Sequence, residues 1–386
     1  VSKSGEADLA LFTDGLSAER EQGITIDVAY RYFATPTRKF IIGDAPGHVQ
    51  YTRNMVTAAS SAHAAVVLVD ATKLKWNVEG LVELLPQTRR HSLLVNLLRV
   101  PSIIFAVNKL DTLGDDAGKA FAKIREALLA FAEHANISVT ATIPMSALKG
   151  DNVVTASEGW CGYTGPSLLT LLEQLPVTAA ETDVPFSFPV QWVEKFHNSS
   201  DTSQGRRVFW GRVATGQVHV GDAVTVLPSG QAARIAQVLD HVRNPKEVHA
   251  GHGAGIVLDR EVDVSRGDWL LAQVTPVVDP NDEFADTPNP QAFLQPAREI
   301  KATVAWMDDE PLIAGRVYWA LHGHRWVKAR VKRVVHSLDV NTLEEHDAGQ
   351  IEPNAIGRIE LLLQEPIAAL PYAQSRVLGS LILVDT

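Results

Sequence analysis

Two acidic motifs, each placed directly after a short apolar run, restrict the folds open to this 386-residue chain more than any other feature. Lys39–Gly43 leads into Asp44-Ala45-Pro46-Gly47-His48, and Ser102–Asn108 leads into Lys109-Leu110-Asp111. Short apolar runs are typical of buried parallel strands, and a proline followed by glycine ends a strand. Carboxylates at the carboxyl ends of such strands lie where α/β sheets place their ligands. We therefore expect a ligand site at one edge of a parallel sheet.

Residues 1–178 alternate between strand patterns and helix patterns. Besides the two runs above, strands are expected at Ala64–Asp70 and Ser138–Met145. Helices are expected at Val49–Ser60, Pro86–Leu98, Ala117–His134 and Pro166–Leu175. This alternation predicts an α/β domain with a doubly wound, mostly parallel sheet.

Four motifs in a fixed order resemble translation-factor-type GTPases: Gly23-Ile24-Thr25, Asp44–His48, Asn108–Asp111 and Ser146-Ala147-Leu148. They match the two switch segments, the guanine-reading NKxD motif and the SAL motif. The sequence around these motifs is similar to the GTPase subunits of bacterial sulfate adenylyltransferases, and less similar to elongation factor Tu. The segments that carry this similarity are DGLSAEREQGITIDVAYRYF, RKFIIGDAPGHVQYTRNM and QTRRHS. The resemblance runs over nearly the whole chain.

The resemblance implies a role for each residue of the two switch segments. Thr25 would offer its hydroxyl to Mg²⁺ when a γ-phosphate is present, and Asp44 would act on that metal through a water. The Gly47 N–H would meet the γ-phosphate. His48 would orient the attacking water, as a glutamine does in other GTPases. These residues are the expected catalytic and metal-binding group.

The resemblance also implies a guanine-binding group. The Asp111 carboxylate can accept both the ring N–H and the exocyclic amine of guanine, a pattern that adenine does not offer. Asn108 would brace the loop, and the stem of Lys109 would lie on the face of the base. Ser146, Ala147 and Leu148 complete the expected GTP and GDP site.

One part of the family's nucleotide site is absent from the sequence given. A G-x-x-x-x-G-K-[ST] phosphate loop should follow the first strand and precede Thr25, and the sequence contains none there. Gly114–Ala120 (GDDAGKA) resembles this motif but does not fit it, since its spacing is one residue short and its aspartates would repel phosphate. A sheet that lacks its first strand exposes two inner edges. We therefore expect the sequence to be a trimmed version of a longer protein.

From residue 183 the pattern changes to short strands of period two, without helices. Residues 183–276 and 296–386 each predict a small antiparallel β-barrel domain, joined by an acidic, proline-rich linker. The expected strands are Phe186–Val193, Arg207–Val213, Gln217–His219, Ala223–Leu227, Glu299–Trp306, Arg316–Leu321, Val327–His336, Ile356–Leu363 and Leu378–Val384.

A basic strand pair in the second barrel is formed by Arg325, Lys328, Arg330, Lys332 and Arg333. By resemblance, it is a docking surface for the catalytic subunit rather than for tRNA.

Three further features have two readings each. Leu74–Leu85 is an apparent insertion, which either packs on its own domain or contacts a partner that senses the nucleotide. Cys161 is read as a packed loop residue rather than a nucleophile, because no His–Asp arrangement supports it. His322-Gly323-His324 is read as a loop rather than a metal site, because no carboxylate or cysteine stands at ligand spacing.

Composition narrows the function further. The formal charge is −10, whereas proteins that wrap nucleic acid usually carry a basic patch or a high pI. No run approaches the roughly 20 apolar residues of a membrane span. A single cysteine excludes an internal disulfide. We expect a cytoplasmic protein with neither a membrane nor a nucleic-acid partner.

The family implies a GTPase that couples GTP hydrolysis to the formation of adenylyl sulfate and pyrophosphate from ATP and sulfate. Its partner would be a separate catalytic sulfate adenylyltransferase subunit, in a hetero-oligomer, with an adenylyl-sulfate kinase fused or associated in some relatives. One alternative is a translation factor that delivers aminoacyl-tRNA, which predicts salt-sensitive tRNA binding. The other is a GTPase-like scaffold, which predicts no nucleotide binding even in the full-length protein.

Overall fold

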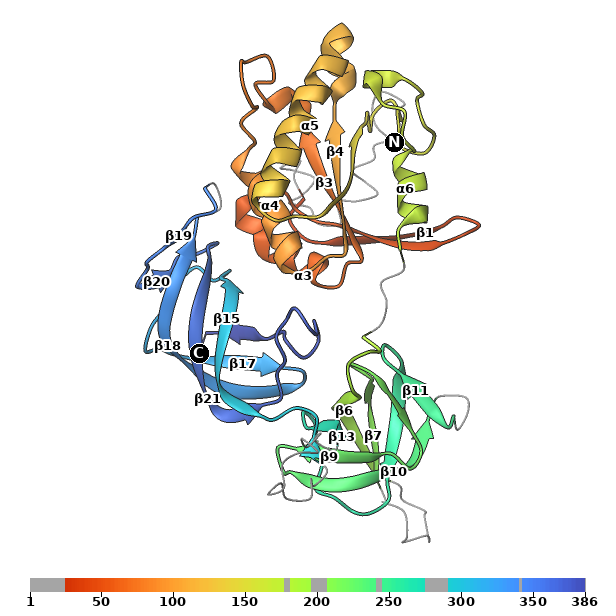
Figure 1. Ribbon diagram of the computed structural model, residues 1–386, viewed down its shortest axis with the longest axis vertical. Helices are drawn as coiled ribbons and strands as arrows, with labels where there is room; N and C mark the ends of the chain where they lie inside the picture. Colours follow the sequence, from red (N-terminus) through yellow and green to blue (C-terminus); the bar gives the residue numbers. More distant parts are fainter. Residues whose placement is uncertain are drawn as a thin grey trace, which may run out of the picture.

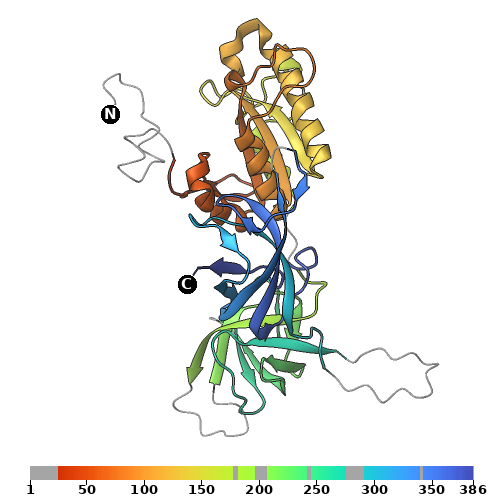
Figure 2. The ribbon, with the colours of Figure 1, turned by 90° about the vertical axis from the view of Figure 1, so that its left-hand side faces the viewer.

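The computed structural model describes residues 25–176, 181–195, 207–240, 245–274, 291–339 and 342–385. The molecule has an α/β part and two all-β parts (Figures 1 and 2). The α/β part lies at one end and the first all-β part at the other, with the second all-β part between them. This arrangement confirms the predicted fold class of an α/β domain followed by two barrels. None of the described helices is both long and apolar enough to cross a membrane.

The parallel sheet has β4 (Ser102–Asn108) at its centre, between β3 (Ala64–Asp70) and β5 (Val139–Pro144). Alternate residues of β4 face opposite layers. Ile103, Phe105 and Val107 pack with α4 (Pro86–Leu97) and α5 (Ala117–His134). Ile104 and Ala106 pack with α6 (Leu168–Gln174) on the other face. Helices on both faces of the sheet are what the alternating pattern predicts.

The segment Lys39–Gly43 differs from its prediction. β2 (Lys39–Asp44) pairs antiparallel with β1 (Ala29–Ala34) in a separate ribbon. Among the described strands, β2 has no partner besides β1, and β3 has none besides β4. Ile41 and Ile42 are consequently exposed, and Leu68 on β3 is 61% exposed. The expected buried parallel strand is therefore wrong, because burial in such a sheet requires a neighbour on each side. Among the described strands, β2 and β3 each have one unpaired edge.

Short helical segments connect the strands of the α/β part. η1 (Val49–Tyr51) and α3 (Thr52–Ser60) follow β2, and η2 (Ala71–Lys73) follows β3. η3 (Leu110–Asp116) follows β4, and η4 (Trp160–Gly162) precedes α6. The polar motifs of the sequence therefore stand on connections that leave the carboxyl ends of strands.

The first barrel closes on itself. Its strands are β6 (Ser187–Lys195), β7 (Arg207–Arg212), β9 (Ala223–Leu227), β10 (Gln231–Leu239), β12 (Gly253–Leu258) and β13 (Trp269–Val274). β13 pairs with both β6 and β9, which completes the ring. The short strands β8 (Gln217–His219) and β11 (Glu247–His249) form a ribbon beside it, and β14 (Gln291–Ala292) extends β13.

The second barrel is a curled antiparallel sheet in the order β15 (Ala297–Ala305), β21 (Ile356–Ile367), β18 (Arg325–Leu338), β17 (Val317–His322), β22 (Ile382–Val384). β19 (Glu345–His346) pairs with β18, and β16 (Leu312–Ile313) pairs with β20 (Gln350–Ile351). The inward residues of its strands, such as Tyr318, Ile359 and Leu361, form a separate core.

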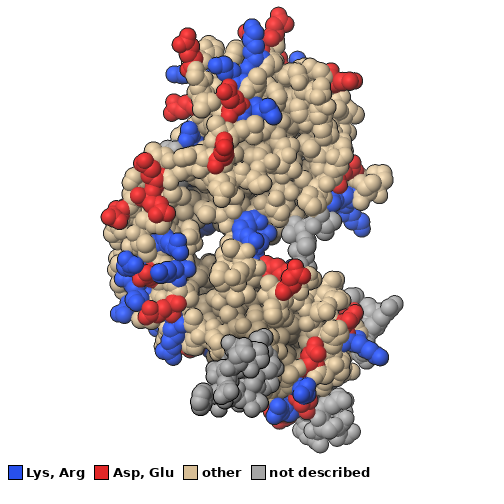
Figure 3. Space-filling model, in the orientation of Figure 1, with Lys and Arg blue, Asp and Glu red and all other residues tan. Residues whose placement is uncertain are grey.

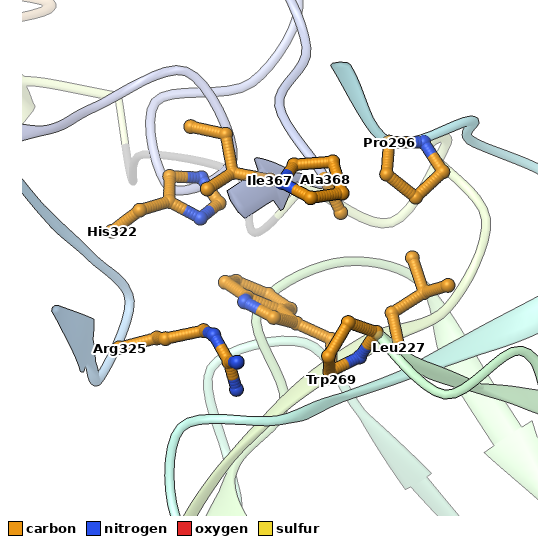
Figure 4. Close-up of a pocket in the computed structure, with 9 residues that line it drawn as sticks. Leu227, Trp269, Pro296, His322, Arg325, Ile367 and Ala368 are labelled. Atoms are coloured by element: carbon orange, nitrogen blue, oxygen red, sulfur yellow. The ribbon is translucent and has the colours of Figure 1, made fainter. Parts of the chain in front are cut away.

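The two barrels meet at a tight apolar joint (Figure 4). The rings of Trp269 and His322 lie 5.3 Å apart between centroids, and the cavity that remains there measures about 10 Å³. Arg325 donates to the mostly buried carboxylate of Asp268 over 2.8 Å. Gly323 has φ +60°, and a Cβ at this position would lie 2.6 Å from the Trp269 ring. Glycine is needed here for both reasons.

The α/β part meets the second barrel through arginines that donate to main-chain carbonyls. Arg53 in α3 donates to the carbonyl of Met307 over 2.9 Å. Arg376 donates to the carbonyl of Ser60, at the other end of α3, over 2.7 Å. Both ends of α3 are thus attached to the second barrel.

A second set of contacts lies at the end of α4. Arg99 donates to the carbonyl of Tyr372, and the Tyr372 hydroxyl donates to the carbonyl of Leu98 over 3.0 Å. Met307 and Ile356 add apolar contact with the core of the α/β part. A polar cavity of about 350 Å³ remains in this joint, lined by Gln50, Tyr51, Arg53, Asn54, Met307, Asp309 and Asn354.

Candidate functional site

The predicted guanine-binding residues stand at the carboxyl edge of the parallel sheet. Asp70 and Asn108 end two paired strands and lie opposite each other in the register of β3 and β4. β5 runs parallel to β4 and ends at Pro144, two residues before Ser146. The fold therefore brings the NKxD and SAL motifs to adjacent strand ends, as the sequence predicts.

The side chain of Asn108 connects these two motifs. Its Oδ1 accepts hydrogen bonds from the backbone N–H of Lys109 over 2.8 Å and of Ala147 over 2.9 Å. Lys109 adopts a left-handed conformation with φ +64°, which turns the chain sharply after the strand. Because Oδ1 is occupied in this way, the amide group of Asn108 is left to donate in another direction.

The loop after β5 is held in a compact turn by Ser146. This buried side chain accepts a hydrogen bond from the N–H of Lys149 over 3.1 Å, and its carbonyl accepts one from Gly150 over 2.8 Å. Leu148 points outward and is 88% exposed. The predicted SAL residues therefore comprise one buried hydroxyl, one backbone donor and one exposed apolar side chain.

Two ion pairs complete this group, and sequence reasoning missed a residue in each. Lys109 Nζ lies 2.8 Å from Asp70 Oδ2, and Lys149 Nζ lies 3.9 Å from Oδ2 of Asp111. The side chain of Asp111 is only 8% exposed. The position of Asp70 at a strand end was a usable signal in the sequence, whereas that of Lys149 became apparent only from the loop geometry.

The pKa of Asp70 reflects opposing effects. Burial raises it, but hydrogen bonds from Lys109 and Thr72 outweigh burial and hold the pKa below its ordinary value of 3.8. Asp70 is thus ionised at neutral pH and keeps the Lys109 ammonium at the sheet edge.

The residues predicted for the switch segments lie before β1, at the end of β2 and in the turn that follows β2. Asp44 ends β2 and is half-buried, whereas Gly47 and His48 are exposed. The carbonyl of His48 accepts a hydrogen bond from the N–H of Tyr51 over 3.0 Å, at the start of the helical segment. Asn54 in α3 donates to the carbonyl of Ile26 over 2.7 Å, which holds the segment just after Thr25 against this helix. Gly23 and Ile24 lie outside the described residues.

The two residues predicted to bind Mg²⁺, Thr25 and Asp44, carry oxygen atoms, which are the ligands that this ion prefers. Among the described residues, no group of three His, Cys, Asp or Glu side chains is placed to hold a metal. Mg²⁺ in nucleotide sites needs only one or two protein oxygens, since phosphates and waters supply the rest. The Thr25 hydroxyl and the Asp44 carboxylate would be ligands of that kind.

The remaining sequence features are structural. Cys161 packs on the core of the α/β part, as predicted. Burial raises the pKa of its thiol to about 11. His322 is buried, its Nε2 lies 3.0 Å from the carbonyl of Leu378, and burial lowers its pKa. His324 lies in the turn between β17 and β18.

The Leu74–Leu85 insertion packs on its own domain. Leu74, Val82 and Leu84 are buried in the core of the α/β part. Lys123 of α5 donates to the carbonyls of Val78 and Gly80 over 3.4 and 3.5 Å. These contacts favour the reading in which the insertion is a structural element.

Comparison with known families agrees with this architecture. Residues 1–180 match the elongation factor Tu GTP binding domain, and residues 299–386 match the GTP-eEF1A C-terminal domain-like family. A crystal structure of sup35 complexed with GMPPNP covers 92% of this chain and 80% of that chain at 21% identity, with a TM-score of 0.43. This score is low, and the fold described above rests on the strand pairing alone.

Two curated relatives match almost the entire chain. The bifunctional enzyme CysN/CysC of Xylella fastidiosa is 45% identical over 98% of this chain, which spans 55% of that protein. Sulfate adenylyltransferase subunit 1 of Laribacter hongkongensis is 41% identical over 98% of this chain, which spans 72% of that protein. At this identity and coverage, the chain belongs to the sulfate adenylyltransferase subunit 1 family.

Proposed function

We propose that this chain is the GTP-binding and GTP-hydrolysing subunit of a sulfate adenylyltransferase. A GTP-binding domain at residues 1–178 would read the nucleotide, and barrel domains at residues 183–276 and 296–386 would relay its state. The subunit would couple GTP hydrolysis to the formation of adenylyl sulfate and pyrophosphate from ATP and sulfate.

The observation that carries this proposal is the Asn108 bridge between the two base-reading loops. Because Oδ1 of Asn108 accepts from both Lys109 and Ala147, the loops are held side by side before any nucleotide binds. Asp111 then offers a nearly buried carboxylate beside them. A guanine that hydrogen-bonds to this carboxylate is favoured over adenine, which would leave it unpaired, and such sites discriminate strongly.

Binding and hydrolysis would divide between the two groups. Asn108, Lys109, Asp111 and the Ser146–Leu148 loop would hold the base. Gly47 would donate its N–H to the γ-phosphate, and His48 would orient the attacking water. Mg²⁺, held by Thr25 and through a water by Asp44, would neutralise charge on the phosphates.

The coupling would pass through α3. This helix follows Asp44–His48 after the short η1 segment. It is attached to the second barrel at both ends, by Arg53 at its start and by Arg376 of the barrel at its end. A change in the segment that senses the γ-phosphate would therefore move α3 against the barrel. This would be one route by which hydrolysis pulls forward the uphill formation of the phosphate–sulfate anhydride.

The partner would be a separate catalytic subunit that binds ATP and sulfate, with an adenylyl-sulfate kinase fused or associated. The experiment mixes the full gene product with that catalytic subunit. It follows GTP hydrolysis with and without ATP plus sulfate, and adenylyl sulfate yield with and without GTP. We expect ATP plus sulfate to accelerate GTP hydrolysis, and GTP to raise the yield of adenylyl sulfate.

Two variants make the test specific. His48→Ala should abolish the stimulation while GTP still binds, because His48 acts on water and not on the base. Asp111→Asn exchanges an acceptor for a donor, and so should weaken GTP and favour xanthosine triphosphate, which carries a carbonyl where guanine carries its amine. Hydrolysis that ignores sulfate but responds to ribosomes or tRNA would establish the translation-factor alternative instead.

A further inference from the structure

The outer face of the second barrel carries an apolar patch that no described element covers. Side chains of β17 alternate, so that Tyr318 and Ala320 point inward while Val317 and Trp319 point outward. Trp319 is 37% exposed, and Trp326 on β18 is 50% exposed. Large apolar side chains gathered on a surface mark an interaction site more often than scattered ones do.

Strand register places these residues side by side. Trp319 lies opposite Lys328 on one side and Val384 on the other. Leu321 lies likewise between Trp326 and Ile382, and Ile382 and Val384 are exposed. We call this surface, made of Val317, Trp319, Trp326, Ile382 and Val384 with Lys328 and Arg330, the tryptophan face.

The charge on this face is positive, although the chain as a whole carries −10. Of the basic strand pair predicted from the sequence, three members are neutralised by carboxylates of this barrel or of the first barrel. Lys332 pairs with Glu299 over 3.1 Å, Arg333 with Glu360 over 2.9 Å, and Arg325 with Asp268 and Glu365. Figure 3 shows lysine and arginine side chains over this barrel, with Asp and Glu side chains among them.

Lys328 and Arg330 are the two cations left for a partner. Neither lies within ion-pair distance of a carboxylate in the described part of the chain. Lys328 Nζ instead lies 5.5 Å from the centre of the Trp319 ring, a cation–π contact that holds the ring in place on the surface. Exposed tryptophans flanked by cations are the residue types that dominate binding energy at protein interfaces.

We propose that the tryptophan face is the docking surface for the catalytic subunit of sulfate adenylyltransferase, through an apolar patch ringed by Asp and Glu on that subunit. The identity of the partner rests on the function proposed above, whereas its chemistry follows from this face. RNA is disfavoured as the occupant, because Glu299, Glu360 and Glu365 lie among the cations of the same sheet and would repel phosphates.

The test measures the affinity of the full gene product for the purified catalytic subunit at several salt concentrations. A Trp319→Ala/Trp326→Ala double variant should bind about tenfold more weakly or worse. Lys328→Glu should weaken binding several-fold and reduce its dependence on salt. Trp192→Ala is the matched control, because Trp192 is 63% exposed on the first barrel and lies outside the face.

Each outcome decides between the claims. A double variant that binds as tightly as the unmodified protein would overturn the assignment of this face, as would an equal loss of affinity in Trp192→Ala. A face that binds tRNA in place of the subunit would overturn it as well. If the unmodified protein forms no complex, both the face and the proposed partner fail. GTP hydrolysis by the gene product alone, which none of these substitutions touches, reports separately on the GTPase assignment.

Discussion

The second barrel contacts both neighbouring parts of the molecule, one mainly through apolar packing and the other mainly through polar hydrogen bonds. Its joint with the first barrel is filled by Trp269 and His322, leaving a cavity of about 10 Å³ around a mostly buried ion pair. Its joint with the α/β part rests on arginines that donate to carbonyls beside a polar cavity of about 350 Å³. Dense apolar packing resists small displacements, whereas exposed polar contacts can be exchanged for water. The two barrels should therefore move as one body relative to the α/β part.

The largest effect should come from Trp269→Ala. Trp269 is 3% exposed at the barrel–barrel joint, and truncation of a buried tryptophan typically costs about 3–5 kcal/mol. The free energy of unfolding of the barrels, measured by urea titration, should fall by this amount, while Trp192→Ala should change it by less than about 0.5 kcal/mol. Equal losses in the two variants would contradict a tightly packed joint.

The buried ion pair should give this joint a pH dependence. Burial raises the pKa of Asp268 above its ordinary 3.8, and hydrogen bonding from Ser265 and the charge of Arg325 only partly offset it. The protonated carboxyl is therefore favoured in the folded state. Its stabilising effect is complete below the unfolded pKa and is lost as the pH rises through the folded pKa.

Asp268→Asn removes that titration. The unfolding free energy of the unmodified protein, relative to the variant, should thus decrease as the pH is raised from 3 towards neutrality. Asp347→Asn, the same substitution at an exposed position, serves as the control for the change of residue type. A difference that grows with pH would mean that Arg325, not burial, governs Asp268.

The smallest effect on stability should come from the polar joint. Arg53→Ala with Arg376→Ala removes both attachments of α3, yet each exposed hydrogen bond contributes only about 1 kcal/mol. The free energy of unfolding should therefore fall by no more than about 2 kcal/mol. Small-angle X-ray scattering should nevertheless show a broader range of arrangements, and stimulation of GTP hydrolysis by ATP plus sulfate should fall. An unchanged scattering profile would mean that the apolar contacts of Ile356 and Met307 alone fix this joint.

The sequence predicted most of the carboxyl edge of the parallel sheet, because short-range pattern determines where strands end. β3, β4 and α5 have the predicted bounds, and Asn108 and Ala147 are adjacent as the motif order required. The pairing of Lys39–Gly43 was not predictable, because burial of a strand depends on neighbours that lie far away in the chain.

The sequence also did not predict which individual basic side chains form ion pairs. A run of basic residues on β18 reads as one patch, yet cross-strand carboxylates neutralise Arg325, Lys332 and Arg333 and leave Lys328 and Arg330. Likewise, Lys149 beside Asp111 follows from the turn that Ser146 imposes. Such pairings are set by register and loop geometry.

The arginine contacts of α3 also bear on how this joint can change over generations. The acceptors are the main-chain carbonyls of Met307 and Ser60, which every amino acid supplies. Substitutions at these two acceptor positions therefore leave the bond available, and only loss of Arg53 or Arg376 removes it. At the barrel–barrel joint, in contrast, Trp269, Gly323 and His322 fit one another by shape, so a change in one requires a matching change in its neighbours. Sequence drift should accordingly be freer on the acceptor side of the nucleotide-domain joint than between the barrels.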